Sequence, residues 1–368
     1  MTKKKLNEIS RLLNGYAFKS SKYVQSGLRV IRIANVQDGY LSDSDPCFYP
    51  IETTTELEQF LLKPHDLLMS LTGNVGRVAF IEKEYLPAGL NQRVECIRPF
   101  NESDKEYLYY FFRSPIFQRE SLKASHGSAQ LNLSTVWLAN FYVVYPDEEK
   151  RKTAVNTLRT IDNLIREKRN QLIELDSLIK SRFMEMFGEW NLSFQKENWI
   201  KLSDLTNIYT GTTPKTEIEE YWNGLIPWVT PAELDKDSYL ITDTERHITE
   251  KGQKSKSLTM MPIGTVLLST RAPIGKVAIC GVPMTCNQGF KNFECLEKLH
   301  PTYLFYLLKL NNDWLQTQGT GTTFKEISKS KAGNIRIPVP TMSDQKDFAQ
   351  FYNLVDKSRF VVHSRYFL

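Results

Sequence analysis

The sequence predicts an α+β protein made of two copies of one mixed α/β domain, each copy followed by a long helix. Two observations lead to this prediction: an internal repeat that spans almost the whole chain, and a stretch from 147 to 187 without glycine or proline. The length of 368 residues suits two or three domains. We expect the first domain at 1–145, its helix at 146–188, the second domain at 199–340 and a shorter second helix at 341–368.

The repeat is a series of matching segments that keep their order along the chain. Leu67–Phe80 matches Val266–Ile279, and the pair Asn91–Gln92 returns as Asn287–Gln288. Further matches are Leu6 with Leu202, Gly15 with Gly211, Lys19 with Lys215, Tyr107–Phe112 with Tyr303–Leu308, and Phe141–Pro146 with Ile335–Pro340. The offset stays between 194 and 199 residues throughout, so chance similarity does not account for it.

Each domain is expected to contain a β-hairpin, then an amphipathic helix, and to end on a strand. Short apolar runs on both sides of a glycine-containing turn favour the hairpin. The hairpins are predicted at Leu67–Ser70 with Val78–Ile81 and at Leu267–Ser269 with Val277–Ile279. The helices are predicted at Tyr107–Arg119 and Tyr303–Asn311, and the closing strands at Ala139–Tyr145 and Lys331–Val339.

The stretch from 147 to 187 is typical of a helix that packs against another helix. Its apolar residues are spaced by three or four, with one polar gap at Lys168, which is a heptad pattern. At about 1.5 Å per residue the helix is roughly 60 Å long, more than one domain core needs. We expect a spacer whose apolar face docks a partner, with a solvated linker helix as the alternative. The docking residues are predicted to be Leu158, Ile161, Ile165, Leu172, Leu175, Ile179 and Phe183.

Composition points to a globular protein of a reducing compartment. Apolar residues make up 41% of the chain and aromatic residues 12%, while a net charge of +5 permits a polyanionic partner without requiring one. The five cysteines form no C-x-x-C pair, so we expect reduced thiols and neither disulfides nor a zinc site. The N-terminal lysines precede no long apolar run, and we predict no signal peptide and no membrane span.

The sequence lacks the motifs of the common catalytic and cofactor sites. It contains no G-x-G-x-x-G loop, no P-loop and no Asn/Asp-Pro-Pro-aromatic box of an amino-methyltransferase. The five histidines are scattered without the spacing of metal ligands. We therefore expect a chain that is not an enzyme by itself and that holds no cofactor and no metal.

The residues that do repeat are polar and lie in predicted loops, which is typical of a surface that meets DNA. Amides can bond the edge of adenine through two hydrogen bonds, arginine can do the same with guanine, and lysine contacts phosphate. The DNA-binding candidates are Lys19, Asn74, Arg77, Asn91, Gln92, Arg93, Gln130, Lys215, Arg271, Lys276, Asn287, Gln288 and Thr322. The same residues could equally form turns, satisfy buried backbone groups or lie on a solvated face.

The order of domain, helix, domain and helix, with a hairpin, an Asn-Gln pair and a polar turn in each domain, resembles the specificity subunit of a bacterial type I restriction–modification system. The resemblance implies two target-recognition domains that each read one half of a split double-stranded DNA site. It implies antiparallel coiled-coil helices that dock methyltransferase subunits, which carry S-adenosylmethionine. It also implies a restriction subunit that translocates DNA, all in the cytoplasm. The second helix, from about Ser343, departs from this pattern because it is shorter than the first.

Two other functions stay open at this point. A repeat-built scaffold that binds proteins and not DNA would lack the steep salt dependence that phosphate contacts produce. A fused restriction–methylation enzyme would need a fold that binds the methyl donor, whereas two domains and two helices already occupy the 368 residues.

Overall fold

The computed structural model describes residues 2–127, 130–194, 196–235, 238–271, 273–321 and 325–364, with side chains of the last helix described as far as Arg359. The chain divides into two compact units, one ending at Glu167 and the other beginning at Lys168. The division falls inside the long helix, so each unit holds one globular domain and one part of that helix. We call the globular parts domain 1 (up to residue 145) and domain 2 (residues 199–340).

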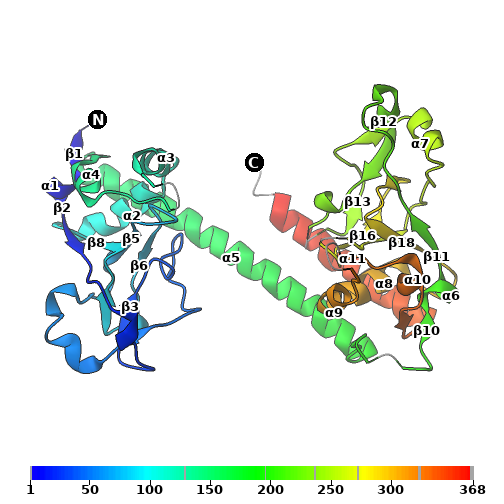
Figure 1. Cartoon of the computed structure of the whole chain (residues 1–368), viewed down its shortest axis with the longest axis horizontal. Helices are drawn as coiled ribbons and strands as arrows, with labels where there is room; N and C mark the ends of the chain where they lie inside the picture. Colours follow the sequence, from blue (N-terminus) through cyan, green and yellow to red (C-terminus); the bar gives the residue numbers. More distant parts are fainter. Residues whose placement is uncertain are drawn as a thin grey trace. The chain divides into compact units, whose positions relative to one another are not determined.

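Domain 1 is built on a four-stranded antiparallel sheet with one small sheet and one strand pair beside it (Figure 1). The main sheet has the order β2 (Ser10–Asn14), β8 (Val94–Pro99), β5 (Leu67–Ser70) and β6 (Val78–Phe80). The small sheet has the order β4 (Phe48–Tyr49), β3 (Leu28–Ile31) and β7 (Ala88–Leu90), and β1 (Lys3–Lys5) pairs with β9 (Tyr142–Val144). The helices are α1 (Leu6–Ile9), α2 (Lys105–Arg113), α3 (Pro115–Ala124) and α4 (Thr135–Asn140).

Alternation along the strands divides the core of domain 1 into layers. Met69 of β5 points to one face of the sheet and packs in a cluster with Phe112 and Phe117 of the helices. Its neighbour Leu68 points to the other face and packs in a cluster with Leu90 of the small sheet. The period of two along a strand thus places helices on one face of the main sheet and the small sheet on the other.

Domain 2 repeats this plan with one more strand in the main sheet. That sheet has the order β11 (Thr206–Thr210), β18 (Phe290–Cys295), β15 (Val266–Ser269), β16 (Val277–Cys280) and β13 (Leu240–Ile241). The small sheet has the order β14 (His247–Ile248), β12 (Trp222–Val229) and β17 (Thr285–Cys286), and β10 (Ile200–Lys201) pairs with β19 (Arg336–Ile337). The helices are α6 (Leu202–Leu205), α7 (Glu250–Ser255), α8 (Pro301–Leu310), α9 (Asn312–Thr317) and α10 (Lys329–Gly333).

The strand pairing confirms the repeat that the sequence predicts. The order β2-β8-β5-β6 in domain 1 corresponds to β11-β18-β15-β16 in domain 2. In both small sheets the central strand runs parallel to a neighbour, β3 to β7 and β12 to β17. Both predicted hairpins are present as antiparallel pairs, β5 with β6 and β15 with β16. The sequence repeat is therefore a repeat of topology and not only of composition.

Three predicted elements differ from the structure. The helix expected over Tyr107–Arg119 is two helices, because Ser114 is extended, caps α3 through its side chain and is followed by Pro115. The strands expected at Ala139–Tyr145 and Lys331–Val339 are shorter, since the helices α4 and α10 occupy their first residues. In each case a serine N-cap and local backbone hydrogen bonds prevail over an apolar run.

The long helix α5 (Glu148–Phe187) is continuous, as the sequence predicts, and its first part belongs to the first unit (Figure 1). Arg151 Nε donates to Asp104 Oδ1 at 2.8 Å, and both side chains are buried. Further along α5, Asp162 accepts a hydrogen bond from Arg113 of α2 at 3.0 Å. This end of α5 is therefore held to domain 1 by ion pairs.

The last part of α5 is held to domain 2 by aromatic packing. Phe183 is fully buried, with its ring 5.7 Å from that of Tyr303 in α8 and 5.2 Å from that of Phe348 in α11 (Met342–Ser364). Arg359, further along α11, donates to Asp176, which lies earlier on α5. Because later residues of α11 meet earlier residues of α5, the two helices are antiparallel. In the part of the chain that the structure describes, no helix is long and apolar enough to cross a membrane.

Candidate nucleic-acid interface

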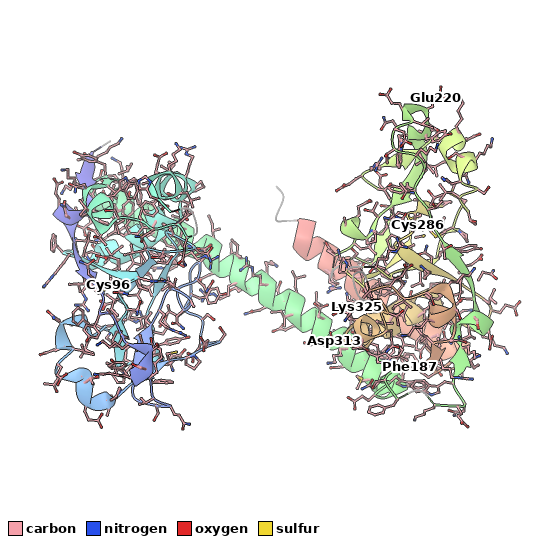
Figure 2. All side chains as sticks on the ribbon, viewed as in Figure 1. Cys96, Phe187, Glu220, Cys286, Asp313 and Lys325 are labelled. Carbon is pink, nitrogen blue, oxygen red and sulfur yellow. The ribbon has the colours of Figure 1, made fainter. Side chains whose placement is uncertain are left out.

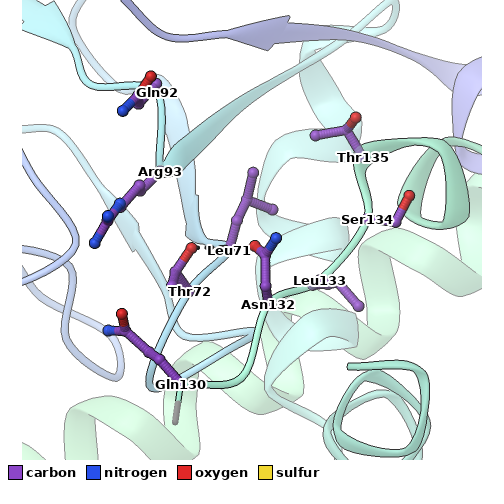
Figure 3. A pocket seen from close by; sticks show the side chains of 9 residues that line it. All are labelled: Leu71, Thr72, Gln92, Arg93, Gln130, Asn132, Leu133, Ser134 and Thr135. Carbon is purple, nitrogen blue, oxygen red and sulfur yellow. Dashed lines mark hydrogen bonds between the residues drawn. The ribbon is translucent and has the colours of Figure 1, made fainter. Parts of the chain in front are cut away.

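Three segments of domain 1 meet in a polar pocket of about 520 Å³ at the end of the main sheet (Figure 3). They are the β5–β6 turn, the turn before β8 and the segment before α4. The pocket is lined by Leu71, Thr72, Gln92, Arg93, Gln130, Asn132, Leu133, Ser134 and Thr135. The structure thus brings together three of the predicted DNA-binding residues, Gln92, Arg93 and Gln130, from distant parts of the sequence.

Backbone hydrogen bonds hold these segments in place and leave the long side chains at the surface. Leu71 donates its N–H to the carbonyl of Arg93 at 3.0 Å and accepts one from Leu133 at 2.8 Å. Thr72 Oγ1 donates to Asn132 Oδ1 at 3.1 Å across the pocket. Gln92 and Arg93 are exposed. A fixed framework therefore carries amide, hydroxyl and guanidinium groups that face solvent.

The corresponding place in domain 2 holds a cluster of charged residues. Arg271 Nε donates to Glu326 Oε2 at 2.9 Å, and Lys291 Nζ donates to Glu326 Oε1 at 3.1 Å. Lys291 also lies 3.4 Å from Thr270 Oγ1 and is only 6% exposed. Burial alone would raise the pKa of Glu326, but hydrogen bonds from Lys291 and Arg271 outweigh it and lower the pKa. Glu326 is therefore ionised at neutral pH and binds both cations.

Several predicted residues already have partners within the chain. Asn91 Oδ1 accepts from the N–H of Arg93 at 3.2 Å, and Asn287 Oδ1 accepts from the N–H of Gly289 at 2.8 Å. The two asparagines thus stabilise corresponding turns, one in each domain. Arg77 donates to Gln37 at 2.6 Å and to the amide oxygen of Asn74 at 3.2 Å. Lys276 Nζ donates to the carbonyl of Pro231 at 2.9 Å. Each of these groups contributes to loop structure.

The remaining predicted residues are exposed or lie outside the described residues. Lys19 and Lys215 are exposed, and the carbonyl of Lys215 accepts from the indole of Trp222 at 3.1 Å. Gln288 is exposed and accepts from Thr213 at 2.7 Å. Thr322 lies outside the described residues.

Sequence reasoning missed the residues that complete the two clusters, which are Thr72, Asn132 and Thr135 in domain 1 and Thr270, Lys291 and Glu326 in domain 2. The repeat contained a usable signal, because Asn132 and Glu326 occupy matching positions. Asn132 pairs with Thr72 and with His126, and Glu326 pairs with Arg271 and with Thr320. A polar residue that changes type between two copies of one loop marks a position where framework needs do not dictate the side chain.

One buried group of domain 1 was also missed. Glu95 on β8 is fully buried, and among the described residues neither of its carboxylate oxygens has a hydrogen-bond partner. Burial raises the pKa of Glu95 to about 7. Its counterpart on β18 is Lys291, since Met69 pairs with Glu95 and Leu268 pairs with Lys291 in matching registers.

The cysteines and other potential ligands provide no metal centre within the described ranges, where no group of three or more His, Cys, Asp or Glu side chains could hold an ion. Cys96 and Cys286 are buried inside their domains (Figure 2). Burial raises the pKa of Cys286 to about 12, which leaves its thiol protonated and unreactive. All five cysteines are free thiols.

The fold and its paired polar loops define a protein with two copies of one recognition domain on a helical connection. Comparison with known sequences identifies the family: the chain belongs to the type I restriction modification DNA specificity domain family, which matches residues 1–175 and 196–360. This confirms the resemblance inferred from the motifs. The two matched ranges show that the chain carries this DNA specificity domain twice.

Relatives and solved structures agree with this assignment. The type I restriction enzyme MjaIX specificity subunit of Methanocaldococcus jannaschii is 38% identical over 49% of this chain and 43% of its own length. The EcoR124I/EcoR124II specificity subunit of Escherichia coli is 24% identical over 70% of this chain and 64% of its own length. The matched parts thus span 43% to 64% of the length of these relatives. The crystal structure of the S subunit from M. genitalium has the same fold, with a TM-score of 0.61, 14% identity and coverage of 99% of this chain and 91% of that one.

Proposed function

We propose that this chain reads a two-part DNA sequence, with domain 1 reading one half and domain 2 the other. The observation that supports it best is the matched loop cluster in the two domains, which has one backbone framework and different polar side chains. Amide, hydroxyl and guanidinium groups are the donors and acceptors that recognise base edges. Exposed lysines such as Lys19 and Lys215 supply phosphate contacts that position the domains without reading sequence.

The proposal includes partners that perform the chemistry. Methyltransferase subunits dock on α5 and bring S-adenosylmethionine, and a restriction subunit with translocase activity joins them, in the cytoplasm of a prokaryotic cell. The specificity subunits of the relatives come from an archaeon and a bacterium. The M. genitalium structure is itself described as an S subunit of such a system.

The exposed part of the helical seam supports this docking. In the first unit Leu158 and Ile161 are 40% and 46% exposed although they are large and apolar. Ile165, also in the first unit, is half-buried. In the second unit Leu175 and Leu178 border a hollow of about 450 Å³ on the helix surface. Ile179 and Phe183 are buried in the core cluster that α5 forms with domain 2 and α11, and Leu172 is half-buried. The docking surface is therefore the earlier and middle part of the predicted set.

The experiment is to express the chain with its methyltransferase in a host without other methylation and to sequence the modified bases. We expect one asymmetric motif in two parts, separated by unspecified bases. A single uninterrupted or palindromic motif would contradict the assignment of one half-site to each domain. Binding in vitro should weaken steeply with salt, and salt-independent binding would instead support a protein-binding scaffold.

A matched pair of variants tests the docking surface in the same system. Leu158→Asn removes an exposed apolar contact and should weaken methyltransferase binding while the thermal stability of the chain stays the same. Thr157→Ser, at the neighbouring exposed position, is the control and should change neither. Equal methyltransferase binding by Leu158→Asn and the native chain would place the interface elsewhere.

A further inference from the structure

We propose that one arginine in each domain reads a guanine, Arg93 for the half-site of domain 1 and Arg271 for that of domain 2. This inference rests on the proposed DNA-reading function and adds which residue reads which base. The two arginines lie in different loops, so the repeat alone does not align them. Their common position follows from the hydrogen bonds around them.

Matching backbone hydrogen bonds place both arginines at one site of the fold. The N–H of Leu71 donates to the carbonyl of Arg93 at 3.0 Å, and the N–H of Thr270 donates to the carbonyl of Gly289 at 2.7 Å. Arg93 therefore corresponds to Gly289. Arg271 directly follows Thr270 and corresponds to Thr72, which borders the same pocket as Arg93. Each domain thus has a single arginine at these two adjoining positions, from the turn before β8 in one and from the hairpin turn in the other.

Arg271 is held with its terminal nitrogens available. Within the described part of the chain, its only side-chain hydrogen bond runs from Nε to Glu326, at 2.9 Å. Its side chain is 45% exposed. Glu326 is itself fixed by the buried Lys291, at 3.1 Å. An arginine that is anchored through Nε keeps the fork of two terminal nitrogens that matches O6 and N7 of guanine, and its anchoring reduces the entropy lost on binding.

Arg93 has a different setting. It is exposed beside Gln92 and Gln130, and no described residue accepts a hydrogen bond from its guanidinium. Two residues further on, in β8, Glu95 lies buried without a hydrogen-bond partner among the described residues. The free side chain of Arg93 therefore samples more conformations than that of Arg271. We expect the guanine of the domain 2 half-site to be read more stringently than that of the domain 1 half-site.

The test is to replace each arginine by lysine in the complete chain and to compare motifs after co-expression with the methyltransferase. Lysine keeps the charge but loses the planar fork. Arg271→Lys should reduce the preference for guanine at one position by about 10- to 100-fold and leave the other half-site unchanged. Arg93→Lys should do the same in the opposite half-site, with a smaller change. Arg119→Lys, an exposed arginine of α3 outside the pocket, is the control and should alter neither.

Binding of purified complexes to DNA sites with each base varied separates the outcomes. An equal loss of affinity for all sequences in Arg271→Lys and Arg93→Lys would show that the arginines contact phosphate and would overturn the inference. Unchanged motifs in both variants would also overturn it, provided that the native complex marks a two-part site. If the native complex itself marks no two-part site, the proposed function fails and not only the role of the arginines. Unchanged melting temperatures of the lysine variants would exclude misfolding as the cause.

Discussion

Domain 1 and domain 2 share one backbone fold and differ in the charged side chains at matching positions. At matching positions of β8 and β18, domain 1 buries Glu95 and domain 2 buries Lys291. The acid has no hydrogen-bond partner among the described residues, whereas the base binds Glu326. The shared hydrogen bonds define the framework, and the exchanged side chains near the loops are the part that is free to vary. This division fits the proposed reading of a different half-site by each domain.

The two domains also differ in the contacts by which each holds α5. Domain 1 holds it through the buried ion pair of Arg151 with Asp104, and domain 2 through the rings around Phe183. Directional ion pairs and non-directional aromatic burial respond differently to substitution and to pH. Five variants make this contrast between the domains measurable, and hydrogen exchange of β8 and of β18 reports the stability of each domain separately.

The largest effect is expected for Phe183→Ala. This fully buried ring packs against α8 and α11, and its loss leaves a cavity that should destabilise domain 2 by about 4 kcal/mol. Exchange of β18 should accelerate while that of β8 stays the same. Equal acceleration in both strands would mean that the two domains unfold as one cooperative unit.

The next effect is a loss of stability with rising pH that is confined to domain 1. Because burial raises the pKa of Glu95 to about 7 from the model-peptide value of 4.5, folding takes up a proton between these pH values. The stability of domain 1 should therefore fall as the pH rises through this window, by up to about 3 kcal/mol. Glu95→Gln should remove most of this slope, which urea titrations at pH 5 and pH 8 would measure.

Domain 2 is the internal control for that slope. Burial, with a further contribution from Lys346, lowers the pKa of His300 in domain 2, so the folded state binds protons less readily there. Its stability should rise with pH below the ordinary histidine pKa, opposite in sign to domain 1. A decrease of the same size in both domains would show that Glu95 is not the source.

A smaller loss is expected for Lys291→Met, which keeps the buried aliphatic volume and removes the cation. Glu326 then keeps Arg271 as its only described cationic partner, and domain 2 should lose about 2 kcal/mol. Thermal unfolding at neutral pH measures this loss. A variant as stable as the native chain would show that the cluster serves orientation of Arg271 and not stability.

The smallest effects are expected for Asn91→Ala and Asn287→Ala. Each side chain accepts one hydrogen bond within its own turn, so each variant should lose about 1 kcal/mol in its own domain and keep its DNA motif. This result would settle that the asparagines stabilise turns. A changed motif in one half-site would instead assign them to base recognition.

The sequence by itself determined the repeat, both hairpins and the 40-residue helix α5, because these depend on periodicity within one segment. The same reasoning extended one helix across Ser114 and Pro115, although those two residues are a local signal for a break. It also placed Ile179 and Phe183 in one docking seam with Leu158. A heptad pattern shows that a face is apolar, but which part of that face is covered depends on the elements that fold back onto it.

Only the tertiary structure decided which polar residues meet. Gln92, Arg93 and Gln130 line one pocket because backbone hydrogen bonds join three loops that are distant in sequence. Lys276, in contrast, donates a hydrogen bond to the carbonyl of Pro231. In the sequence, Glu95 and Lys291 look like ordinary charged residues on the exposed face of a strand. Only the structure shows that both are buried. Spacing along the chain determines which face a side chain occupies. The partners of its charge are set by contacts between distant segments, which no local pattern encodes.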